Sequence, residues 1–275
     1  MSGKLYIVGT PIGNLGDLSP RAVQTLNDVD FIAAEDTRVT LKLLNHFDIH
    51  TPQVSYHEHN KSGKGEYIAD RIAAGENCAV VTDAGMPAIS DPGEDLVRLC
   101  RERGIEVVTV PGPSAVITAL ALSGMSCRRF SFEGFLSANK SERRAQLESL
   151  RPEKRTMVFY EAPHKLLATL TDMEKAFGDR QTAVVRELTK IHESCTDTTL
   201  SQAVAYYSEN QPKGEYVLIV SGAQDEEREA LSVEEAIKLA KGYAEDGMPL
   251  SKAAKRASAE SGVSRADIYK AIAQK

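Results

Sequence analysis

The chain has 275 residues, of which 42% are hydrophobic and 26% charged, and its formal net charge at pH 7 is -6. This composition is ordinary for a globular protein in water, and the length exceeds what one hydrophobic core usually holds. The acidic balance argues against a general nucleic-acid coat protein. Because the sequence has no long apolar run and no signal-peptide pattern at its start, we expect a cytoplasmic protein without membrane contact.

The first 112 residues alternate short apolar runs with amphipathic segments, which predicts βαβ units on a mostly parallel sheet. The expected strands occupy residues 4–9, 30–35, 52–56, 78–83 and 105–110. The expected helices occupy residues 20–26, 66–74 and 94–103. We therefore predict an N-terminal α/β domain over residues 1–112.

The loop after the first strand, GTPIGNLGDL at residues 9–18, is rich in glycine. Its glycines do not have the GxGxxG spacing of a dinucleotide-binding loop, which argues against NAD. Ser19 followed by Pro20 marks the start of the next helix, with a capping side chain and proline at the first helical position.

The most constrained loop is TDAGMPAISDPG, residues 82–93, which follows the apolar strand CAVV. Glycines and prolines restrict its backbone, and Asp83 and Asp91 can accept hydrogen bonds from neighbouring amides. An ordinary turn needs about four residues. A long, constrained loop at the carboxyl end of a strand predicts a ligand site.

After the PGP at residues 111–113 the pattern changes, and we predict a second α/β domain over residues 113–223 with a mixed sheet. Strands are expected at residues 130–135, 156–163, 182–188 and 215–222, and helices at 117–124, 141–150 and 165–177. With a hinge at residues 111–113, ligand loops of both domains would face one cleft.

A charged linker is expected at residues 222–230, followed by a helical C-terminal tail at residues 231–275. Ser232 and Glu235 form a capping-box pattern, and two further helices flank SGVS at residues 261–264, which resembles a helix-turn-helix. A three-helix docking module fits the pattern equally well.

Two segments reverse the acidic balance of the chain. Residues 128–155 hold eight Lys or Arg against four Glu, and residues 250–275 hold six against two acidic residues, a net +4 in each case. A solvated helix face explains such runs as well as a binding site does. Together they favour a local contact with an anionic partner.

The four cysteines lie far apart without a CxxC pair, so we expect free thiols. His57 and His59 flank Glu58 and invite a metal interpretation, but a third ligand at a diagnostic spacing is missing. We therefore expect no metal site.

Seven motifs in order resemble the tetrapyrrole methylase superfamily, and the resemblance covers the whole chain. They are VGTPIGN (8–14), AEDTR (34–38), TDAGMPAISDPG (82–93), VPGPSAVITALALSG (110–124), FYEAPHKL (159–166), RELTKIHE (186–193) and GEYVLIVSG (214–222). The resemblance implies two α/β domains with a cofactor cleft between them, S-adenosylmethionine as cofactor, and a homodimer. It points within the superfamily to enzymes that methylate a cytidine 2′-hydroxyl of 16S rRNA, alone or in the assembled small ribosomal subunit.

The resemblance also implies which residues lie against the cofactor. They are Pro11, Asp83, Ala84, Gly85, Ala88, Ile89, Ser114, Ala115, Tyr160, Glu161, Arg186, Glu187, Gly214 and Glu215. Carboxylates suit the sulfonium and amino groups of S-adenosylmethionine, and glycine amides suit its carboxylate. Small apolar side chains permit close approach of the adenosine.

Methyl transfer to a ribose hydroxyl is mostly a positioning problem, although a base near the hydroxyl would help. The catalytic candidates are Asp36, Glu35, Arg38 and Lys190, with Asp36 first because AEDTR follows the second strand at the same sheet end as the first loop. Arg38 could hold an RNA phosphate. Asp36 could equally cap the next helix.

Two other functions fit the same scaffold: methylation of a tetrapyrrole precursor or a protein side chain, and RNA binding without catalysis. A small tetrapyrrole requires neither the basic segments nor the tail, which favours RNA as substrate.

Overall fold

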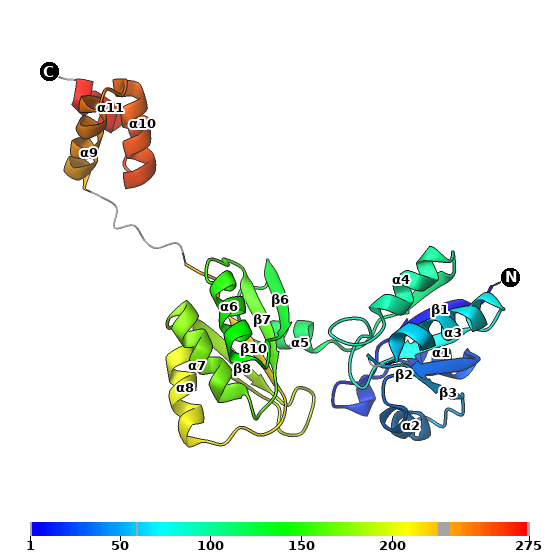
Figure 1. Cartoon of the computed structure of the whole chain (residues 1–275). Coiled ribbons are helices and arrows are strands. Elements are labelled where there is room, and N and C mark those ends of the chain that lie inside the picture. Colours follow the sequence, from blue (N-terminus) through cyan, green and yellow to red (C-terminus); the bar gives the residue numbers. More distant parts are fainter. Residues whose placement is uncertain (1, 59, 225–231, 274–275) are drawn as a thin grey trace. The chain divides into compact units, whose positions relative to one another are not determined.

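The computed structural model describes residues 2–58, 60–224 and 232–273. They form two compact units, Met1–Gly222 and Ala223–Lys275, and the first unit holds two five-stranded sheets (Figure 1). The boundary predicted between residues 112 and 113 falls between the last strand of the first sheet and the helix that follows it. His59 and residues 225–230 of the predicted linker lie outside the described residues.

The first sheet, predicted to be mostly parallel, is entirely parallel and has the order β3-β2-β4-β1-β5. Its strands are β1 (Lys4–Val8), β2 (Phe31–Ala34), β3 (Gln53–Ser55), β4 (Cys78–Val81) and β5 (Glu106–Val110). Neighbouring β1 and β4 are separated in the chain by β2 and β3, so the order reverses between them. In open α/β sheets this reversal creates the ligand crevice at the carboxyl ends of the strands.

Two helices cover each face of this sheet. The helices α1 (Pro20–Asp28) and α2 (Thr37–His46) share one core with the sheet. The helices α3 (Lys61–Ala73) and α4 (Glu94–Glu102) share the other. All four residues of β2 and of β4 are buried, because a central parallel strand is covered on both sides. Ser19 caps α1 by accepting the Ala22 N–H.

The second sheet is mixed, as predicted, with the order β6-β7-β10-β8-β9. Its strands are β6 (Phe130–Phe135), β7 (Thr156–Glu161), β8 (Gln181–Arg186), β9 (Ser194–Thr199) and β10 (Tyr216–Val220). Only β6 and β7 pair in parallel. One face packs on α6 (Lys140–Leu150), α7 (Leu166–Phe177) and α8 (Leu200–Glu209), and the other on α5 (Ala115–Leu122).

The sequence did not predict β9 or α8, and it placed the start of α3 five residues late. The strand β9 is a polar edge strand, SCTDTT, which lacks the apolar alternation of a half-buried strand. Pairing with β8 alone determines it. The helix α8 begins directly after it, capped by Thr199, so no loop separates the two elements.

The second unit consists of α9 (Val233–Glu245), α10 (Leu250–Ser261) and α11 (Arg265–Ala273) around a small core of alanines and Ile268. The capping box of Ser232 and Glu235 is present, as predicted. Gly262 ends α10 with a left-handed φ of 74°, and α11 follows three residues later. None of the helices in the described part of the chain is long and apolar enough to cross a membrane.

Candidate functional site

The loops that follow β1 and β4 are joined to each other at the crevice of the first sheet. Thr10 and Gly85 exchange two backbone hydrogen bonds, with N···O distances of 2.9 and 3.2 Å. The Thr10 hydroxyl also donates to the Thr82 carbonyl at 3.0 Å. Gly85 has a φ of 89°, which an L side chain rarely adopts. The two loops therefore act as one wall.

A pair of glycines fixes the same loop to the segment after β5. A Cβ built on Gly9 would lie 2.7 Å from the Gly112 Cα, and one built on Gly112 would lie 2.8 Å from the Gly9 Cα. Glycine is required at both positions because two backbones meet there. This contact places Ser114 and Ala115, at the start of α5, beside the crevice.

A cavity of about 500 Å³ lies between the carboxyl ends of strands from both sheets of the first unit. This volume is in the range of sites for small molecules and cofactors. Apolar side chains form much of the wall, and carboxylates lie among them. The lining residues contributed by the first sheet and its loops are Ile12, Glu35, Asp83, Ala84, Gly85, Met86, Ile89, Ser90 and Asp91.

The carboxylates of the first wall, Glu35, Asp83 and Asp91, are not matched by basic side chains in the cavity lining. Burial raises the pKa of each, and mutual repulsion adds to the shift. Asp83 accepts the Asp36 N–H at 3.2 Å. Within the described residues Asp91 has no hydrogen-bond donor, and burial with the charges of Glu35 and Asp83 raises its pKa to about 6. A cation in this cavity would relieve that repulsion.

The second wall differs, because its carboxylates already have partners. Glu187 accepts a hydrogen bond from the Lys190 ammonium at 3.0 Å, and this bond lowers the Glu187 pKa. Burial would lower the pKa of Lys190, but its bonds to Glu215 and Glu187 outweigh burial and raise it. Lys190 is thus a stable cation.

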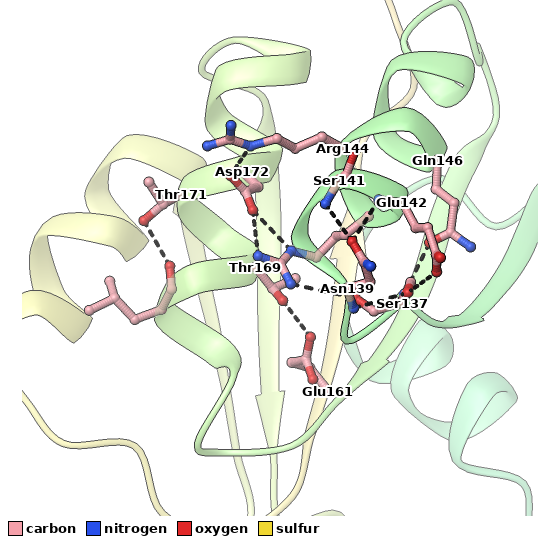
Figure 2. A network of polar contacts seen from close by, with 12 residues as sticks. Ser137, Asn139, Ser141, Glu142, Arg144, Gln146, Glu161, Thr169, Thr171 and Asp172 are labelled. Carbon is pink, nitrogen blue, oxygen red and sulfur yellow. Dashed lines mark hydrogen bonds and ion pairs between the residues drawn. The ribbon is translucent and has the colours of Figure 1, made fainter.

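Glu161 belongs to a network that joins β7 to α6 and α7 (Figure 2). It is 5% exposed and accepts the Thr169 hydroxyl at 2.5 Å. On α7, three residues after Thr169, Asp172 binds the Arg143 guanidinium through two hydrogen bonds of 2.9 and 2.6 Å, and Arg144 at 3.1 Å. Burial opposes ionisation of Asp172, yet the two arginines hold its pKa below the usual value.

This network removes Arg143 from the basic residues of the segment 128–155 that were expected to favour an anionic partner. Arg143 is 8% exposed and its charge is matched by Asp172, so it supports the fold instead of facing a partner. A charge count along the chain cannot separate such a residue from an exposed one.

Most residues expected at the cofactor reach the cavity wall: Asp83, Ala84, Gly85, Ile89, Ser114, Ala115, Tyr160, Glu161, Glu187 and Glu215. Four others are absent from the lining, namely Pro11, Ala88, Arg186 and Gly214. Gly214 has a clear local role, since a Cβ there would lie 2.6 Å from the Glu187 carboxylate. Arg186 donates from Nε to the Lys213 carbonyl at 2.7 Å.

Of the four catalytic candidates, Glu35 alone lines the cavity. Asp36 is the N-cap of α2 and accepts the Arg38 N–H at 2.8 Å. The Arg38 guanidinium forms two further hydrogen bonds with the Asp36 carboxylate and holds its pKa far below the usual value. A carboxylate so strongly held as an anion is a weak base, and capping accounts for its geometry.

Sequence reasoning missed several lining residues. Asp91 was expected to accept hydrogen bonds from neighbouring amides, whereas the structure places it in the cavity lining without a donor among the described residues. Ile12 and Phe135 carry no chemical signal in the sequence, because an apolar side chain at a cavity resembles one in a core. In the part of the chain that the structure describes, no cluster of three His, Cys, Asp or Glu could hold a metal ion.

The arrangement of two α/β sheets around this cavity defines a class of proteins. The family model of the tetrapyrrole (corrin/porphyrin) methylases matches residues 4–204, so the chain belongs to that family. The chain is also 50% identical over 268 residues to the ribosomal RNA small subunit methyltransferase I of Synechocystis, covering 97% of this chain and 96% of that protein. The Bacillus subtilis protein of the same name is 43% identical over 276 residues, with 98% and 94% coverage.

Solved structures support the fold at low identity. A cobalt precorrin-4 methyltransferase superposes with a TM-score of 0.60 at 18% identity, covering 79% of this chain and 94% of its own. A diphthine synthase gives 0.62 at 12% identity, with 80% and 90% coverage. S-adenosylmethionine is the methyl donor that membership of this methylase family implies.

The residues of the cavity fit this donor. Its sulfonium and amino groups match the unpaired carboxylates of the first wall, chiefly Asp91. Ile89, Val185 and Val217 supply apolar surface for the adenosine.

Proposed function

We propose that this protein transfers a methyl group from S-adenosylmethionine to a cytidine 2′-hydroxyl of 16S rRNA in the small ribosomal subunit. The observation that carries the proposal is the acidic first wall of the cavity, in a chain that shares half its residues with a small-subunit rRNA methyltransferase. That likeness covers 97% of the chain and so includes the helical tail, whereas the methylase family model ends at residue 204.

When bound, S-adenosylmethionine supplies a methyl group already activated by its sulfonium. The protein contributes position, electrostatics and a proton acceptor. Asp83 and Asp91 attract the cationic part of the ligand, and the joined loops around Thr10 and Gly85 keep this wall fixed.

Glu35 is the residue best placed to receive the acceptor's proton. Its side chain lines the cavity, and burial raises its pKa toward the working range of a general base. Its Oε2 atom accepts the Asp83 N–H at 3.4 Å, which orients the carboxylate, and Oε1 would take the proton. Lys190, held as a cation by two carboxylates, would instead stabilise charge on the acceptor or bind RNA phosphate.

The decisive experiment supplies radiolabelled S-adenosylmethionine and small subunits from a strain that lacks the activity. Label should appear at one nucleotide of 16S rRNA, and resistance of that linkage to alkali would identify a 2′-O-methyl group. Label on a base, on a protein, or on neither would contradict the proposal. Parallel reactions with naked 16S rRNA determine whether the assembled subunit is required.

The homodimer implied by the family resemblance is part of the proposal. The helix α5 is apolar, and Ile117 and Leu122 on it are 55% and 44% exposed. A second copy that covers this face would remove both side chains from water. Light scattering should give twice the chain mass, and Ile117→Glu should reduce it to that of the monomer.

A further inference from the structure

A second hollow of the first unit lies at the opposite end of the second sheet from the cofactor cavity. Its volume is about 480 Å³. Thr156, at the start of β7, lines it, whereas Tyr160 and Glu161, at the end of the same strand, line the first cavity. The first and last residues of this six-residue strand lie about 17 Å apart. The two sites are therefore distinct.

Basic side chains dominate this hollow. Among the described residues its lining includes Arg128, Arg129, Lys154 and Arg155 against one carboxylate, that of Glu153, a charge of +3 for this lining in a chain of net charge -6. Arg128 and Arg129 are exposed, and neither makes a hydrogen bond or ion pair with any residue that the structure describes. These two guanidinium groups are available to an anionic partner.

The neighbouring Glu153 carboxylate holds the Arg155 guanidinium in place. Its Nε and Nη2 donate to the Glu153 carboxylate at 2.9 and 2.6 Å, and these bonds lower the Glu153 pKa to about 2. Pairing of Nε and Nη2 with Glu153 fixes the plane of the guanidinium. The Nη1 atom takes no part in this pair. An arginine fixed in this way loses little conformational freedom when it binds phosphate.

The frame of the hollow is rigid. The Thr156 hydroxyl donates to the Ser126 carbonyl at 2.7 Å, which ties the arginine segment to the start of β7. Gly222 lies so close to β7 that an added Cβ would be 2.0 Å from the Lys154 carbonyl oxygen. Arg180 donates to the Ser221 carbonyl at 3.3 Å and anchors the end of β10. The exposed arginines therefore project from a fixed base.

From these observations we propose that the hollow around Arg128, Arg129 and Arg155 binds the phosphate backbone of the RNA substrate, at the end of β7 opposite to the first cavity. This inference rests on the proposed function. Guanidinium groups match the geometry of phosphate oxygens, and phosphate contacts position a nucleic acid without reading its sequence. The site would hold the RNA in register while the acceptor enters the first cavity.

The test uses the full-length Arg128→Gln/Arg129→Gln variant. We expect its KM for small subunits to rise about tenfold, as loss of roughly 1.4 kcal/mol requires. Each lost phosphate contact should lower the slope of log affinity against log salt by about 0.7 to 0.9, hence by about 1.5 for two contacts. Affinity for S-adenosylmethionine, measured by calorimetry, should not change, which shows that the variant is folded.

Arg98→Gln/Arg101→Gln on α4 is the matched control, because both side chains are exposed and the change in net charge is the same. It should keep the wild-type salt slope. An active wild type with the same slope in both variants would overturn the inference and leave the proposed function intact, whereas an inactive wild type would remove the proposed function itself. Weaker use of assembled subunits with unchanged binding of naked 16S rRNA would assign the hollow to a ribosomal protein and overturn the RNA contact.

Discussion

The two walls of the cofactor cavity both carry carboxylates, but they differ in how those carboxylates are balanced. In the first wall Asp91 lacks a donor among the described residues, and burial raises the pKa of Glu35 and Asp83. In the second wall Glu161 and Glu187 are hydrogen-bonded to Thr169 and Lys190. The difference is that the second-wall carboxylates have hydrogen-bond partners within the protein, whereas Asp91 in the first wall has none among the described residues. Carboxylates in one cavity can thus have structural and binding roles.

The largest effect on the free energy of unfolding is expected at the buried ion pair between Asp172 and Arg143, which joins α7 to α6. Asp172→Ala leaves the buried Arg143 without a full counter-charge, and such a change typically costs about 3 to 5 kcal/mol. Urea denaturation should show this loss. Arg151→Ala, which breaks an exposed 3.9 Å pair with Glu148, is the control and should cost less than about 1 kcal/mol. Equal losses in the two variants would mean that the network does not anchor the wall.

The next largest effect is expected on the affinity for S-adenosylmethionine. Asp91→Asn removes an unpaired charge from the first wall, so affinity for S-adenosylmethionine should fall about tenfold while the protein becomes no less stable. Isothermal calorimetry and thermal unfolding measure the two quantities. Glu94→Gln, on the exposed start of α4, should leave affinity unchanged. A marked loss of stability in Asp91→Asn would assign this carboxylate to the scaffold.

The pH dependence of stability and of ligand affinity should reveal the contribution of Asp91 in the first wall. The pKa of Asp91 in the folded protein, about 6, lies above its ordinary value of 3.8, so the folded state binds its proton more tightly. Its contribution to stability is present at low pH and is lost as pH rises from about 4 to 6, whereas affinity for a cationic ligand rises over the same range. Asp91→Asn should flatten both profiles relative to wild type, and unchanged profiles would refute the assignment.

The smallest effect is expected at Asp36, on the margin of the first wall. Asp36→Asn keeps an oxygen that can cap α2, so methylation should fall far less than the roughly 100-fold or more that loss of a general base causes. Glu35→Gln should show that larger loss in kcat. The reverse ranking, measured with saturating cofactor, would restore Asp36 as the base.

Much of the fold could be predicted from local sequence, because each buried strand of the first sheet is a short apolar run bounded by turn residues. The strand order β3-β2-β4-β1-β5 could not be predicted, because the local sequence pattern does not indicate which strands pair. The polar strand β9 was missed because its structure depends on β8. For the site, the constrained loop at residues 82–93 was a local signal. The burial of Arg143, and the lack of a hydrogen-bond donor to Asp91 among the described residues, depend on residues far away in the sequence. The local sequence could therefore not predict them.

Backbone conformation at the cavity has a thermodynamic consequence for binding. Ala88 and Ser90, in the loop after β4, and Glu187 and Thr189, in the loop after β8, have positive φ values between 51° and 69°, unusual for residues other than glycine. Each such residue raises the free energy of the folded chain by about 1 to 3 kcal/mol. The loop after β4 is held by its own backbone hydrogen bonds, such as that from the Ala88 N–H to the Pro92 carbonyl at 3.2 Å, so we expect little reordering of these turns on binding. Binding should therefore show a small entropy loss from the protein, and a rate of association limited by diffusion into the cavity more than by loop ordering.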